Sequence, residues 1–171
     1  MQWEADFLYW LEQFRSPFMN HVWWFISYVC LVFFFIPIIY FLVKKDTRWK
    51  AICALLCLVV AWFSCAVALK AIINRPRPYE TYTYLTPVVY PIDASFPSGH
   101  TLYSFTLAMM YYKLFDKKFG TLSLVMAFLV SWSRMAMGLH YPSDILGGFL
   151  FALLWVWIFN KWFVPWMKKK Y

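Results

Sequence analysis

The segment SRMAMGLHYPSD, residues 133–144, lies between two strongly apolar runs, TLSLVMAFLVSW at 121–132 and ILGGFLFALLWVWIF at 145–159. The segment carries Arg134, His140 and Asp144. Charged side chains that enter a bilayer are costly unless they are paired, and they mark functional sites by default. The position of these three residues between apolar runs therefore indicates a site at the edge of a membrane.

The composition of the chain is typical of a membrane protein. Of its 171 residues, 63% are hydrophobic and 14% are charged, against about 25% charged residues in soluble domains. Four apolar segments are long enough to cross a hydrocarbon core of about 30 Å, and a fifth is borderline. We expect spans at 21–43, 49–73, 101–115 (the short one), 121–137 and 145–163. The sequence thus predicts one domain over 1–171, an all-α integral membrane helical bundle.

Residues 1–18 precede the first span and differ from it in pattern. Apolar side chains recur there at helical spacing, at Trp3, Phe7, Trp10, Leu11 and Phe14. Polar residues fall between them, namely Glu4, Asp6, Glu12 and Arg15. This pattern predicts an amphipathic helix that lies in the membrane interface.

The basic residues predict the orientation of the bundle. Eleven of the sixteen Lys and Arg lie between the first two spans, between the third and fourth, or near the C-terminus. Because basic residues concentrate on the cytoplasmic side, we expect these regions to face the cytoplasm. The other five, Arg15, Lys70, Arg75, Arg77 and Arg134, then lie at the outer face. We expect this face to be the extracytoplasmic side of a bacterial cytoplasmic membrane.

Three cations at that face are suited to hold a phosphate group. Arg77 and Arg134 offer bidentate guanidinium groups, and Lys70 offers a point charge. The sequence PSGH begins the third span, so the backbone around Ser98 and Gly99 adds free N–H groups at the positive end of a helix dipole. Together these groups predict a binding site for a multiply charged phosphate.

Two histidines and a carboxylate supply groups for catalysis. Asp144 follows His140 by four residues and can accept a hydrogen bond from one ring nitrogen, which leaves the other nitrogen free as a nucleophile. His100 can protonate a departing oxygen. Glu80 and Asp93 stand apart in the sequence, and no ligand set for a metal ion is evident. The pattern therefore disfavours a metal-dependent phosphatase.

In order and spacing, the motifs at 70–78, 97–100 and 133–144 resemble the three-part signature of the type-2 phosphatidic acid phosphatases, members of the vanadium haloperoxidase superfamily. The resemblance implies Mg²⁺-independent dephosphorylation through a phosphohistidine, with His140 as nucleophile and His100 as general acid. It implies that Asp144 orients the nucleophile. It assigns phosphate binding to Lys70, Arg77, Ser98, Gly99 and Arg134. Many members have six spans, whereas five are expected here.

Two other functions remain open at this point. A serine hydrolase with Ser98, His140 and Asp144 as its triad leaves the three cations unexplained. A non-enzymatic carrier of phosphorylated lipids leaves the two histidines and the His–Asp pair unexplained. Arg75 falls outside the matched spacing, and we expect it to be a surface cation.

The identity of the substrate is not decided by the motifs, because they bind a group that many lipids share. Phosphatidic acid, phosphatidylglycerol phosphate and polyprenyl diphosphates all fit. The loop at 79–96 either shapes the opening of the site or rests at the membrane interface. The expected partners are the lipid substrate and the bilayer, with no nucleic acid and no cofactor, and the sequence does not predict an oligomeric state. Gly147 and Gly148 are expected to permit close helix packing.

Overall fold

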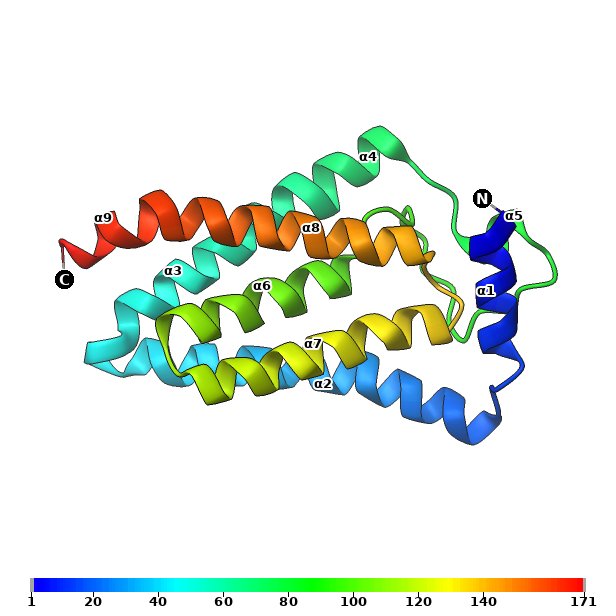
Figure 1. Cartoon of the computed structure of the whole chain (residues 1–171), viewed down its shortest axis with the longest axis horizontal. Helices are drawn as coiled ribbons and strands as arrows, with labels where there is room; N and C mark the ends of the chain where they lie inside the picture. Colours follow the sequence, from blue (N-terminus) through cyan, green and yellow to red (C-terminus); the bar gives the residue numbers. More distant parts are fainter. Residues whose placement is uncertain (1, 171) are drawn as a thin grey trace.

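The computed structural model describes residues 2–170, and every regular element in this range is helical (Figure 1). The long helices run side by side along the molecule: α2 (Pro17–Val43), α3 (Lys45–Ala61), α6 (Gly99–Leu114), α7 (Lys117–Ala136) and α8 (Pro142–Ile158). Figure 1 shows α1 (Gln2–Glu12) lying across one end of this bundle, next to the single turn α5 (Pro78–Thr81).

Two of the long helices continue beyond their regular α-helical part. After α3 the chain forms a π-helical segment, η1 (Trp62–Leu69), and then α4 (Lys70–Ile73). After α8 it forms η2 (Phe159–Phe163) and α9 (Val164–Lys168). The helical path therefore continues five residues beyond residue 163, the expected end of the last span, to Lys168.

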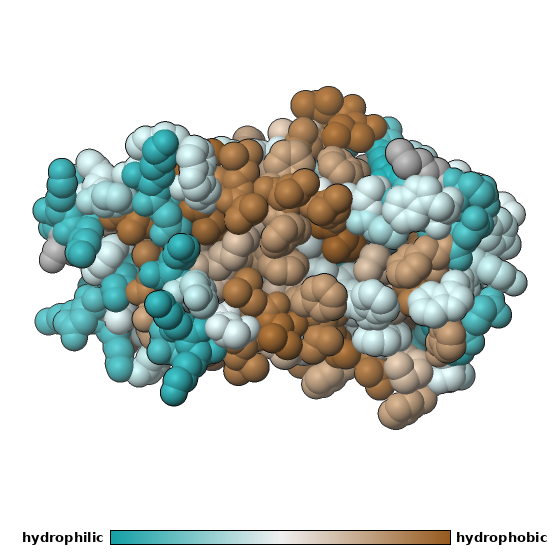
Figure 2. Space-filling model, viewed as in Figure 1, coloured by the Kyte–Doolittle hydropathy of each residue, from teal (hydrophilic) through white to brown (hydrophobic). Residues whose placement is uncertain are grey.

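The predicted membrane bundle is confirmed. Four helical stretches of the described chain are long and apolar enough to cross a membrane: Pro17–Val43, Lys45–Thr81, Lys117–Ala136 and Pro142–Lys168. The expected short span is α6, whose 16 residues extend about 24 Å at 1.5 Å per residue. Figure 2 shows an apolar belt around the middle, and hydrophilic side chains gather at the end that carries the C-terminus in Figure 1.

Helix starts differ from the predicted starts because the capping residues lie earlier. The Ser16 side chain accepts a hydrogen bond from the Met19 N–H (3.2 Å), and Pro17 occupies the first turn of α2, four residues before the expected start. Pro142 likewise opens α8 ahead of residue 145. Proline is favoured in a first helical turn because its missing N–H has no partner there.

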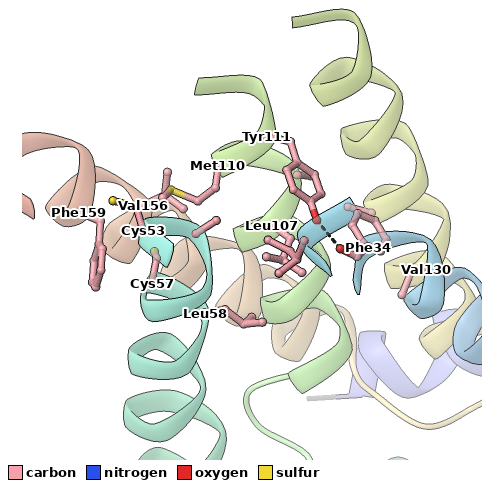
Figure 3. Packing of buried hydrophobic residues seen from close by; sticks show 14 of the residues in the cluster. Phe34, Cys53, Cys57, Leu58, Leu107, Met110, Tyr111, Val130, Val156 and Phe159 are labelled. Carbon is pink, nitrogen blue, oxygen red and sulfur yellow. Dashed lines mark hydrogen bonds between the residues drawn. The ribbon is translucent and has the colours of Figure 1, made fainter. Parts of the chain in front are cut away.

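Helix α6 lies at the centre of the bundle, and its buried face forms the main apolar core with α2, α3, α7 and α8. Figure 3 shows Leu107 and Tyr111 of α6 packed near Phe34 of α2 and Val130 of α7. The Tyr111 hydroxyl donates a hydrogen bond to the Phe34 carbonyl oxygen. This bond satisfies the one polar atom of a buried aromatic side chain.

Two adjacent glycines bring α8 close to the start of α6, as expected. A Cβ atom on Gly148 would lie 2.7 Å from the Ser98 carbonyl oxygen and 3.1 Å from the Thr101 Cβ. A Cβ atom on Gly147 would lie 2.4 Å from the Phe96 ring. The absence of side chains at these positions lets the segment before α6 rest directly on α8.

We predict that Gly148→Ala lowers both thermal stability and enzymatic activity, because the added methyl group overlaps the Ser98 backbone, which cannot rotate away. A matched control is Leu150→Ala, two residues along the same helix, where the side chain is half exposed on the outer surface. Melting temperature in detergent and phosphate release measure the two effects. A Gly148→Ala protein that matches the unsubstituted chain in both would contradict the close packing.

Candidate active site

A cavity of about 320 Å³ opens at the end of the bundle near α1. It is lined by residues from five separate parts of the chain: Tyr28, Trp62, Lys70, Arg77, Pro91, Asp93, Gly99, His100, Tyr103, Arg134 and His140. Six of the eight predicted site residues are in this lining. The other two, Ser98 and Asp144, are buried directly behind it.

Arg77 is held rigidly at the cavity wall. Its backbone N–H donates to Glu80 Oε2 (2.6 Å), which fixes the turn of α5. Its guanidinium donates from Nη1 to the Leu139 carbonyl oxygen (2.7 Å) and from Nε to the Asp93 carbonyl oxygen (2.8 Å). These bonds place the guanidinium against His140, with 3.4 Å between Arg77 Nη1 and His140 Nε2.

Asp93 does not stand alone, contrary to the expectation from sequence. Its two carboxylate oxygens bridge two of the expected phosphate ligands, Lys70 Nζ (2.5 Å) and Arg77 Nη2 (2.7 Å). Lys70 Nζ also donates to the Ala94 carbonyl oxygen (2.6 Å). Partial burial acts to raise the pKa of the Asp93 carboxyl, but Lys70 and Arg77 outweigh it and lower the pKa to about 2. The carboxylate is therefore ionised near neutral pH and neutralises part of the cationic cluster.

Arg134 approaches the cavity from α7 and is almost fully buried. Its Nη1 donates to Ser27 Oγ (2.6 Å), and its guanidinium lies over the Tyr28 ring, 5.4 Å from the centroid. Its Nε has no hydrogen-bond partner in the described chain. This arrangement leaves Arg134 with donor capacity at the cavity.

His140 lies between its predicted carboxylate partner and the cavity. Its Nδ1 is 3.5 Å from Asp144 Oδ2, longer than a hydrogen bond, and its Nε2 is the atom that faces Arg77. Burial lowers the pKa of His140 to about 4; Asp144 opposes this shift, and Arg77 and Arg134 add to it. The imidazole is thus neutral near pH 7 and has a free electron pair.

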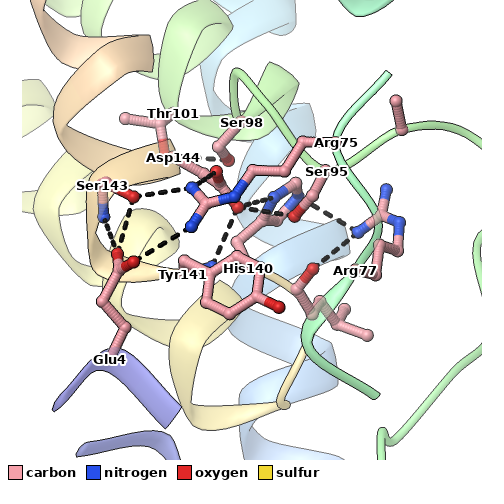
Figure 4. Close-up of polar contacts among 12 residues, drawn as sticks. Glu4, Arg75, Arg77, Ser95, Ser98, Thr101, His140, Tyr141, Ser143 and Asp144 are labelled. Carbon is pink, nitrogen blue, oxygen red and sulfur yellow. Dashed lines mark hydrogen bonds and ion pairs between the residues drawn. The ribbon is translucent and has the colours of Figure 1, made fainter. Parts of the chain in front are cut away.

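Asp144 is completely buried and accepts three hydrogen bonds (Figure 4). Its Oδ2 accepts from Ser95 Oγ (2.5 Å) and from the Tyr141 N–H (2.9 Å). Its Oδ1 accepts from Arg75 Nη1 (2.6 Å). The expectation that Arg75 is a surface cation is therefore wrong, since 23% of its side chain is exposed and it is paired with a buried carboxylate.

Sequence reasoning also missed Glu4, which it placed among the polar residues of an interfacial helix. The side of α1 that packs on the bundle contains Glu4, Ala5, Leu8 and Leu11, whereas the Trp3 and Trp10 side chains are more than half exposed. A signal was present, because Glu4, Leu8 and Leu11 share one face of a helix at i, i+4, i+7 spacing. The helix itself is shorter than predicted and ends at Glu12.

The start of α6 brings the second histidine and the serine to the site. His100 lines the cavity with its Nε2 unpartnered among the described residues, and its ring packs edge-on against Tyr28. The Ser98 N–H donates to the Asp144 carbonyl oxygen (3.1 Å), and its Oγ accepts from Thr101 Oγ1 (3.1 Å). Among the described residues Ser98 Oγ is bonded to Thr101 and not to His140, so the serine–histidine contact of a hydrolase triad is not formed.

The loop between α5 and α6 covers the cavity. The Val88 N–H donates to the Met137 carbonyl oxygen (3.1 Å), and the Tyr79 hydroxyl donates to the Pro91 carbonyl oxygen (2.8 Å). Pro91 and Asp93 then form part of the lining. The loop therefore forms part of the cavity wall, and its seating at the membrane interface stays a prediction.

Residues 50–168 match the family model described as the PAP2 superfamily, and the chain belongs to this family. It is 31% identical over 150 residues to the bacitracin transport permease protein BcrC of Bacillus licheniformis, covering 86% of this chain and 72% of that protein. It is 34% identical over 111 residues to the undecaprenyl-diphosphatase of Sulfolobus acidocaldarius, covering 64% of this chain and 53% of that protein.

The fold is shared with a solved member of the family. The transmembrane PAP2 type phosphatidylglycerolphosphate phosphatase from Bacillus subtilis superposes with a TM-score of 0.78 at 24% identity, covering 96% of this chain and 86% of that one. The resemblance drawn from the three motifs is thereby confirmed at the level of the family.

We predict that Asp93→Asn tightens the binding of vanadate several-fold. Vanadate resembles a phosphoryl group in transfer, and the substitution removes the negative charge that competes for Lys70 and Arg77. Inhibition of phosphate release over a range of vanadate concentrations measures this change. Ile92→Ala, at the adjacent and fully exposed position, serves as the control. Weaker vanadate binding by Asp93→Asn would instead show that the carboxylate orders the two cations for an anion.

Proposed function

We propose that this chain is an Mg²⁺-independent membrane lipid phosphatase, with residues 1–171 as one domain, that works through a phosphohistidine. The observation that carries the proposal is the cavity in which Lys70, Arg77 and Arg134 surround the two histidines. A carrier needs the cations alone. A neutral His140 backed by a buried carboxylate, facing a second histidine across a cationic cavity, is what nucleophilic phosphoryl transfer requires.

In the first step the phosphoryl oxygens lie among Lys70, Arg77 and Arg134, and the N–H groups at the start of α6 add further donors. His140 Nε2 attacks the phosphorus atom and forms a P–N bond. The bond from phosphorus to the leaving oxygen breaks, and His100 donates a proton to that oxygen. Positive charge develops on the His140 ring, and Asp144 stabilises it.

In the second step a water molecule attacks the phosphorus atom of the phosphohistidine. His100, now neutral, accepts a proton from this water. The P–N bond breaks, its electron pair returns to His140 Nε2, and inorganic phosphate leaves. Both histidines end in their initial state, so the cycle needs no further reactant.

A lipid substrate is supported by an apolar groove beside the catalytic cavity. The groove, of about 320 Å³, is lined by Phe35, Leu55, Leu58, Val59, Trp62 and Tyr103. Trp62 and Tyr103 line both spaces, so a hydrocarbon chain in the groove brings its headgroup to the histidines. The names of the relatives, an undecaprenyl-diphosphatase and a phosphatidylglycerolphosphate phosphatase, support a lipid monophosphate or diphosphate as the substrate class.

We assign the site to the extracytoplasmic face of a bacterial cytoplasmic membrane. The basic clusters around Lys45, Lys117 and Lys169 lie at the end of the bundle opposite α1 (Figures 1 and 2). The positive-inside rule places that end in the cytoplasm. The cavity, at the α1 end, then opens on the other side.

We predict different losses for the two histidine variants. His140→Ala should release no phosphate from any substrate, because no covalent intermediate can form. His100→Ala should lose about 10²–10⁴-fold on an alkyl monophosphate lipid and much less on an aryl phosphate, whose leaving group needs no proton. Phosphate release with EDTA present measures both. His21→Ala, at an exposed position on α2, is the control.

Turnover by His140→Ala, or equal losses for His100→Ala on both substrates, would contradict these roles. Loss of activity in EDTA that Mg²⁺ restores would contradict the metal-free mechanism. Phosphate release across phosphatidic acid, phosphatidylglycerol phosphate and a polyprenyl diphosphate identifies the preferred lipid in the same assay.

We predict that a membrane-impermeant maleimide labels Ile92→Cys in intact cells and labels Lys117→Cys only after the cells are broken. Both positions are exposed and lie at opposite ends of the bundle. The unsubstituted chain gives the background from its native cysteines. Labelling of Lys117→Cys alone in intact cells would reverse the proposed orientation.

A further inference from the structure

We propose that Glu4 of α1 is a positioning residue for the reaction, which acts through Arg75 to orient Asp144 and to keep a net negative charge beside His140. This inference rests on the proposed function, because it assigns to His140 the role of nucleophile. It makes α1 a part of the active site in addition to its place at the membrane interface.

Glu4 is a fully buried carboxylate whose hydrogen bonds go to Ser143 and Arg75, the two residues that flank Asp144 (Figure 4). Its Oε1 accepts from the Ser143 N–H (3.0 Å) and from Ser143 Oγ (2.6 Å). Its Oε2 accepts from Arg75 Nη2 (3.0 Å). A buried carboxylate is costly unless it is paired and hydrogen-bonded, and here three donors from two distant segments provide that pairing.

Arg75 connects Glu4 to the catalytic carboxylate. Its Nη1 donates to Asp144 Oδ1 (2.6 Å) and to Ser143 Oγ (2.6 Å), while its guanidinium lies 3.9 Å from the centroid of the Tyr141 ring. With Oδ1 held in this way, the other oxygen of Asp144 lies on the side of His140, 3.5 Å from its Nδ1. Glu4 therefore fixes Arg75, and Arg75 fixes the rotation of the carboxylate that orients the nucleophile.

Charge gives Glu4 a second effect on the nucleophile. Asp144 and Glu4 carry two negative charges against the single positive charge of Arg75, so this cluster is net negative on the Nδ1 side of His140. The remaining charged or titratable groups around His140 face it from the cavity, namely Lys70, Arg77, Asp93, His100 and Arg134. Without the Glu4 charge, Arg75 would cancel Asp144, and only Asp93 would oppose the effect of the cavity cations on the ring.

The position of α1 does not depend on Glu4 alone, which makes a clean test possible. Leu8 and Leu11 pack against Leu85, Met135 and Tyr141. After the end of α1, Arg15 Nη2 donates to the Thr86 carbonyl oxygen (2.6 Å). Glu4→Gln retains the shape of the side chain and one of its two acceptor oxygens, so it removes the charge while the apolar packing of α1 stays in place.

We expect Glu4→Gln to lower kcat about tenfold with KM unchanged. This loss corresponds to a fall of one unit in the pKa of His140, because the imidazole ring becomes positively charged during the reaction. The acid limb of the kcat/KM profile should move to lower pH, since losing a negative charge lowers the pKa of His140. Glu4→Ala should lose more, because Arg75 and Ser143 then lack an acceptor. The control is Asp6→Asn, the same chemical change at an exposed position on α1; kcat and the pH profile should not change.

Spectra of ¹⁵N-labelled histidine in detergent give a second readout that does not need turnover. The pKa of His140 should fall in Glu4→Gln and not in Asp6→Asn. An unshifted His140 pKa, or a loss of activity equal at every pH together with a lower melting temperature, would overturn the inference. Absence of turnover by the unsubstituted chain on every lipid would refute the proposed function instead, and the histidine spectra would still decide whether Glu4 is coupled to His140.

Discussion

The burial of the Asp144 carboxylate is the constraint on which the rest of the site depends. A charge removed from water needs several well-placed donors, and one missing donor leaves an uncompensated charge. Ser95, the Tyr141 N–H and Arg75 supply them, and each comes from a different part of the chain. The loop before α6, the start of α8 and the segment after α4 must therefore meet at one point, and the glycine pair of α8 leaves the room for them.

The cationic cavity has the opposite imbalance of charge, because its positive groups outnumber its negative ones. Lys70, Arg77 and Arg134 lie near one another around a small space, and among the described residues only Asp93 offers a carboxylate inside it. Like charges held this close repel each other, so the cavity favours an anion. Under the proposed function a dianionic phosphoryl group would supply this counter-charge, and the cations that bind it would also stabilise the charge that spreads over its oxygens in transfer.

The parts that could be predicted from sequence depend on local spacing and hydropathy. The apolar runs locate the spans, and the interval from His140 to Asp144 places one residue just before a helix and the other in its first turn. Glu4, Arg75 and Asp93 could not be assigned in this way, because their partners are remote. Asp93 pairs with Lys70 across 23 positions, and Arg75 pairs with Asp144 across 69 and with Glu4 across 71. A periodic pattern reports which face of a helix is apolar, but not which distant side chain a polar residue will meet there.

Helix α1 has an exposed side and a buried side with different surroundings. Its aromatic side, with Trp3 and Trp10, is exposed at the end of the apolar belt and suits a membrane interface. Its opposite side buries Glu4 against Arg75. If α1 were absent, the Arg75 guanidinium would retain Asp144 as its only carboxylate partner, and the negative charge beside His140 would be cancelled. Under the inference made above, the interfacial helix and the Asp144 carboxylate are parts of one electrostatic unit, although Glu4 lies outside the matched residues 50–168.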